Sequence, residues 1–100
     1  MERRKEPRLK ANQPVMVTAL GLLGMPPISG RVVDMSGSGL QLRLPTPVPC
    51  GSQVRVESQH MTMLGEVSRC QDDRNDFIVV LRIINTAPVA GKPSRAIMEV

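Results

Sequence analysis

The chain has 100 residues, enough for one domain with a single modest hydrophobic core. It contains 13 basic and 9 acidic residues, a net charge of +4, and one aromatic residue, Phe77. No apolar run is long enough to span a membrane and no signal peptide is visible, so we expect a cytoplasmic protein without membrane insertion. Proteins that bind single-stranded nucleic acid usually stack bases on aromatic side chains, so we expect no nucleic-acid partner.

Positive charge is concentrated at the N-terminus. Residues 1–10 hold five basic and two acidic side chains, a net charge of +3, so the remaining ninety residues are nearly neutral. Pro7 favours an extended backbone at Glu6 and argues against a helix through this segment. We expect residues 1–10 to form a flexible basic arm that becomes ordered when an anion engages it.

The rest of the chain shows the alternation and turn chemistry of β-strands. Leu40–Leu44 is the clearest case, because three leucines alternate with Gln41 and Arg43. Six short strands at this spacing predict an antiparallel sandwich or a small closed barrel over residues 11–86, followed by a tail or short helix in residues 87–100. The predicted strands are Pro14–Leu20, Ile28–Asp34, Leu40–Leu44, Gln53–Glu57, Met61–Cys70 and Phe77–Ile84, and the helix would begin at Ser94.

The stretch Asp34-Met35-Ser36-Gly37-Ser38-Gly39 separates the second and third predicted strands. Asp and Ser side chains bond nearby backbone amides, and glycine allows positive φ and a close approach to a bound group. Six residues exceed the two of a minimal hairpin. The pattern fits either a wide turn with only a structural role or a binding element.

No pattern of catalytic residues is visible. The single histidine, His60, has no nucleophile or metal-ligand partner at a recognised spacing, and there is no phosphate-binding loop. We therefore expect neither an enzyme nor a cofactor nor a metal site, and the acidic stretch Asp72–Asp76 fits a solvated turn better than a cation site. Cys50 and Cys70 fit free thiols best, and an oxidised pair is the alternative.

Two elements together resemble the PilZ domain. That family carries an RxxxR element before its first strand and a [D/N]xSxxG element at a strand turn. Arg4 and Arg8 match the first element, with Arg3 as an extra leading arginine, and Asp34, Ser36 and Gly39 match the second. The run Gly65–Arg69 and the last strand also resemble the closing hairpin of the family. The chain departs from the family in lacking the aromatic residue, commonly Trp, of the fifth strand.

The resemblance implies an all-β protein with a six-stranded antiparallel barrel that binds the bacterial second messenger cyclic di-GMP. Arg4 and Arg8 would hold guanine and phosphate, because the planar guanidinium donates bidentate hydrogen bonds to both and stacks on bases. The ordering of the arm over the ligand would then change the surface presented to a downstream protein or a fused domain.

On the same resemblance, residues of the turn complete the ligand site. Asp34 only accepts hydrogen bonds and so matches the N–H donors on the Watson–Crick edge of guanine. Ser36 donates or accepts at a base edge or phosphate, and Gly39 leaves room for the ligand. Gly37 and Ser38 would offer backbone N–H groups.

Several alternatives stay open at this stage. Arg3 is compatible with an intercalated ligand dimer, but one or two molecules are both possible. A degenerate PilZ domain that only binds proteins and not nucleotide is the second interpretation. The output pathway, the oligomeric state and whether the chain is a fragment of a larger protein are not determined by the sequence.

Overall fold

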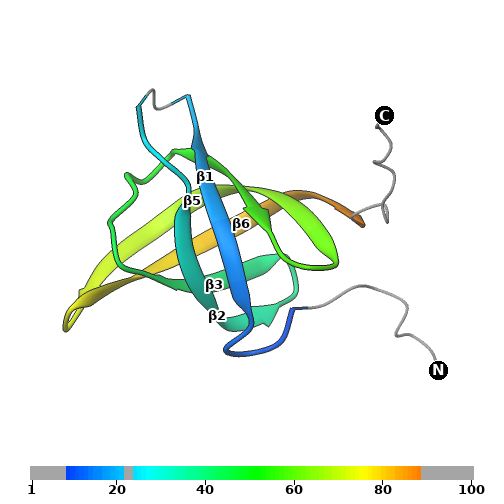
Figure 1. The fold of residues 1–100 in the computed structure, drawn as a ribbon, viewed down its shortest axis with the longest axis horizontal. Helices are drawn as coiled ribbons and strands as arrows, with labels where there is room; N and C mark the ends of the chain where they lie inside the picture. The colour runs from blue at the N-terminus through cyan, green and yellow to red at the C-terminus, as the bar shows by residue number, and fades with distance from the viewer. Residues whose placement is uncertain (1–8, 22–23, 89–100) are drawn as a thin grey trace.

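In the computed structural model, residues 9–21 and 24–88 are described, and they form a closed antiparallel barrel of six strands (Figure 1). Neighbouring strands follow the order β1-β2-β3-β6-β5-β4, and β4 pairs with β1 to complete the closure. Of the two architectures expected from the sequence, the barrel is confirmed. The strands are β1 Pro14–Leu20, β2 Ile28–Ser36, β3 Gly39–Leu44, β4 Gln53–Glu57, β5 Met61–Asp73 and β6 Asp76–Pro88.

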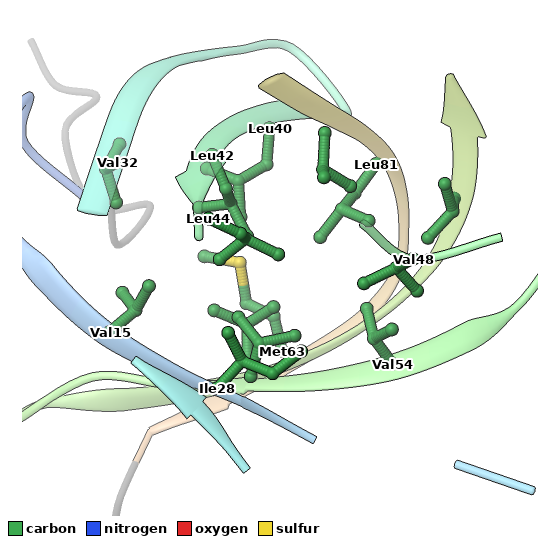
Figure 2. Packing of buried hydrophobic residues seen from close by; sticks show 14 of the residues in the cluster. Val15, Ile28, Val32, Leu40, Leu42, Leu44, Val48, Val54, Met63 and Leu81 are labelled. Atoms are coloured by element: carbon green, nitrogen blue, oxygen red, sulfur yellow. The ribbon is translucent and has the colours of Figure 1, made fainter. Parts of the chain in front are cut away.

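The barrel interior is filled by aliphatic side chains and methionine (Figure 2). Alternate residues of each strand point inward, which is why Leu40, Leu42 and Leu44 are all buried while Gln41 is exposed. Met63 from β5 fills the centre with them, and Val48 from the β3–β4 connection packs on the same cluster. Phe77, the one aromatic residue of the chain, is half-buried and packs against this cluster.

The last two strands are longer than their apolar runs predict. β5 continues through Gln71–Asp73, which the sequence indicates as a linker, and these residues pair with the start of β6. The resulting hairpin projects beyond the barrel at the left of Figure 1. Gln71 and Asp72 are exposed, and β6 still pairs with β3 at Phe77 and Ile78. Exposed strand positions pair through the backbone and tolerate polar side chains, so hydrophobic alternation does not mark the end of β5.

Strand β6 lies between β3 and β5 and pairs with both of them from Phe77 to Arg82. Its Val79 and Leu81 point inward, whereas Ile78, Val80 and Arg82 point outward. The strand therefore closes the barrel, and its apolar residues are fully buried only on the inner face. The register between β5 and β6 shifts twice, between Leu64 and Gly65 and between Val67 and Arg69.

Other expectations can be compared only within the described residues. Cys50 and Cys70 are both free thiols there. The described ranges contain no helix capable of crossing a bilayer. The basic residues 1–8 and the helix expected from Ser94 both lie outside the described residues.

Candidate functional site

The turn between β2 and β3 is tighter than the sequence predicts. Ser36 pairs with Gly39, so only Gly37 and Ser38 lie between the strands. Gly37 has a φ of 55°, whereas Ser38 has no positive φ, which is the φ pattern of a type II′ hairpin turn. The expectation of a six-residue turn is wrong, because Asp34, Met35 and Ser36 continue β2 as paired strand residues.

A bulge at Val33 turns the polar residues of β2 outward. Val32 pairs with Leu42, but the next pair joins Asp34 to Gln41, so Val33 is an extra residue on β2. Without this bulge, strict alternation after the buried Val32 would point Asp34 into the barrel. The bulge shifts the alternation by one residue, so Asp34 and Ser36 are exposed on the outer face.

The chain preceding β1 is fixed beside this bulge. Leu9 is buried in the core, 6% exposed, and its backbone N–H donates to Sδ of Met35 at 3.3 Å. The backbone N–H of Asn12 donates to the Val32 carbonyl at 2.7 Å, and the Val32 N–H donates to Gln13 at 3.0 Å. Figure 1 shows this dark-blue segment next to the β2–β3 hairpin. Leu9 therefore anchors the chain beside the hairpin, at the point where residues 1–8 join the barrel.

A hollow of about 280 Å³ lies over the bulge and against the preceding segment. Arg31 and Arg43, which line it, are cross-strand partners on the outer face. Arg31 donates to the Asn12 carbonyl at 2.8 Å, and Arg43 lies 2.8 Å from a carboxylate oxygen of Asp73. Neither arginine is indicated as a site residue by the sequence, because their pairing depends on the register of β2 against β3.

Asp34 is exposed on the outer face of β2. Among the described residues, no basic side chain forms an ion pair with it. Gly37 is held in a left-handed conformation, whereas a Cβ at Gly39 would lie 3.5 Å from the Ser36 carbonyl oxygen, an ordinary contact. The hairpin therefore requires glycine at position 37 for its backbone but not at position 39 for its packing.

The structure brings together only part of the predicted site. Asp34, Ser36, Gly37, Ser38 and Gly39 lie in one hairpin, on strands β2 and β3 and the turn between them. The predicted ligand residues Arg3, Arg4 and Arg8 are outside the described residues. Within the described ranges, no group of three or more metal-ligating side chains is arranged to hold an ion. The acidic residues Asp73 and Asp76 both lie within 4 Å of Arg43.

The chain was compared with known protein families, curated proteins and solved structures. The sequence model of the PilZ domain matches residues 2–92, which include both candidate elements. No curated protein is significantly similar to the chain, and no solved structure is.

Proposed function

The chain belongs to the PilZ domain family, a family of cyclic di-GMP receptors, and we propose that it binds this nucleotide on the outer face of the β2–β3 hairpin. The observation that carries the proposal is the bulge at Val33. It exposes Asp34 and Ser36 on the same face of β2, beside the segment that connects residues 1–8 to the barrel.

Arg4 and Arg8 are close enough to Leu9 along the chain to reach this face. Consecutive Cα atoms are about 3.8 Å apart, so Arg8 directly adjoins the anchored Leu9. Arg4 is four residues further, a span of at most about 14 Å. We propose that Arg4 and Arg8 donate to phosphate and guanine, with Arg3 as an additional donor.

The acceptor side of the site is supplied by the hairpin. Asp34 accepts from the N–H groups of guanine, and Ser36 bonds a base edge or a phosphate. Gly39 leaves the strand surface open to the ligand, and the turn at Gly37 and Ser38 adds backbone N–H groups. The exposed Arg31 in the adjoining hollow adds positive charge near the phosphates.

Titration calorimetry with cyclic di-GMP tests the proposal, with GTP and linear pGpG as competing nucleotides. Because a charge-assisted hydrogen bond contributes about 1.5–3 kcal/mol, Asp34→Ala and Arg8→Ala should each weaken binding by about tenfold or more. Arg55→Ala and Glu57→Ala are matched controls, because both residues lie on β4, whose neighbours are β1 and β5.

Two results would contradict the proposal. One is wild-type affinity in both Asp34→Ala and Arg8→Ala. The other is a folded wild-type protein that leaves cyclic di-GMP free at high micromolar concentration, which would favour the alternative of a PilZ domain that binds only proteins.

A further inference from the structure

Four residues form a row across the outside of the barrel, on the adjacent strands β2, β3, β6 and β5. Ser36 pairs with Gly39, Gly39 with Arg82, and Arg82 with Glu66. Directly opposed residues of antiparallel strands point to the same face. Ser36 and Arg82 are exposed, so the whole row faces solvent and includes two residues of the proposed ligand site.

The surface between Ser36 and Arg82 is bare backbone. Neighbouring strands are about 4.8 Å apart, so these two residues are about 10 Å apart across the row, with only Gly39 between them. The Ile83 N–H donates to the Ser38 carbonyl at 2.7 Å, which fixes the turn against β6. A planar ring has room to lie along the row between a hydroxyl and a guanidinium.

The Arg82 guanidinium is held in place and still accessible. Its Nη2 lies 2.5 Å from Oε1 of Glu66, and the side chain is 62% exposed. An arginine has five N–H donors, so this contact leaves most of them available. An exposed ion pair contributes little to stability, so the pair is not required by the fold.

The charge of the pair favours a base over a phosphate. The Glu66 carboxylate offsets the positive charge of Arg82 and would repel a nearby phosphate. A neutral base meets no such repulsion, and the guanine edge with O6 and N7 accepts two hydrogen bonds from one guanidinium. Adenine offers N7 but a donor in place of O6, so the same arginine discriminates between the two bases.

We propose that Arg82 reads a guanine of the bound nucleotide and that Glu66 is a positioning residue that orients its guanidinium. This inference rests on the proposed function and extends the site from the β2–β3 hairpin to β6 and β5. It assigns to Arg82 the selectivity of the site for guanine over adenine, in addition to a share of the affinity.

The test compares cyclic di-GMP and cyclic di-AMP by calorimetry in the full chain. Arg82→Ala should weaken cyclic di-GMP binding by about tenfold or more and leave any cyclic di-AMP binding nearly unchanged. Arg82→Lys keeps the positive charge but not the planar guanidinium that donates two hydrogen bonds, so it should lose the same selectivity. Glu66→Ala should give a smaller loss, and Glu66→Gln, whose amide oxygen still accepts from Arg82, should restore most of it.

Arg55 and Glu57 are the control pair, 3.6 Å apart and similarly exposed on β4. Arg55→Ala and Glu57→Ala should leave both affinities unchanged, and urea unfolding should show that every variant is folded. Unchanged cyclic di-GMP affinity in Arg82→Ala, or an equal loss for both nucleotides, would overturn the inference while the proposed function stands. No binding by the wild-type chain would instead overturn the proposed function itself.

Discussion

Gly37 and Gly39 lie two residues apart in one hairpin, yet the structure constrains them differently. Gly37 has a positive φ and open space around it, so its backbone conformation and not its packing requires glycine. Gly39 has no positive φ, and a Cβ there would lie 3.5 Å and 3.9 Å from carbonyl oxygens. The backbone of the hairpin therefore requires glycine at position 37. The proposed role of glycine at position 39 is to leave room for the ligand.

The two glycines should respond differently to substitution by alanine. Gly37→Ala should cost about 1 kcal/mol in the free energy of unfolding, because alanine is strained in the left-handed region. Gly39→Ala should unfold at nearly the wild-type urea concentration but bind cyclic di-GMP about tenfold or more weakly, since its methyl group occupies the ligand surface. Urea unfolding and calorimetry check both; wild-type affinity in Gly39→Ala would contradict the role of this surface.

At the scale of whole elements, the sequence predicts which segments are strands but not how they are offset. β1 and β4 have the bounds that alternation predicts, and the spacing of Asp34, Ser36 and Gly39 indicates the candidate hairpin. The bulge at Val33 is not predictable, because period-two alternation carries no signal for an extra residue. The outward row from Ser36 to Glu66 depends on three registers, which only the folded barrel defines.

The segment before β1 also acts as an element, because a buried side chain anchors it. Leu9 falls within the predicted flexible arm of residues 1–10, yet it packs in the core beside Met35. The flanking polar residues gave no indication of this contact. An anchor at this position determines the point from which Arg8 would reach the proposed ligand face.

Truncation of the anchor should therefore affect binding as well as stability. Leu9→Ala removes buried methyl groups and should cost about 2 kcal/mol or more in the free energy of unfolding. It should also weaken cyclic di-GMP binding several-fold, because Arg8 is then less restricted. Val54→Ala, a core truncation on β4, is the control and should lose stability but not affinity. Equal affinities in the two folded variants would show that Leu9 has only a packing role.

Across the whole molecule, the two sides of the barrel wall have separate roles. Inward residues such as Leu42 and Val54 form the core, whereas Asp34, Ser36 and Arg82 are exposed on the outer face. Substitutions on the outer face should consequently leave the barrel folded. Binding free energy at this face is then added to the stability of the whole domain, because the ligand binds the folded state.

Cyclic di-GMP should stabilise the domain and order its N-terminal residues together. At a free concentration 100 times the Kd, binding adds about 2.7 kcal/mol, which raises the Tm by about 10–20 °C in a domain of this size. If Arg4 and Arg8 contact the nucleotide bound on the β2–β3 hairpin, amide hydrogen exchange in residues 2–10 should slow on binding. In the double variant Arg4→Ala/Arg8→Ala, the Tm without ligand should stay near the wild-type value, whereas both ligand effects should be nearly lost. A wild-type Tm increase with unchanged exchange in residues 2–10 would show that the nucleotide binds without ordering this segment.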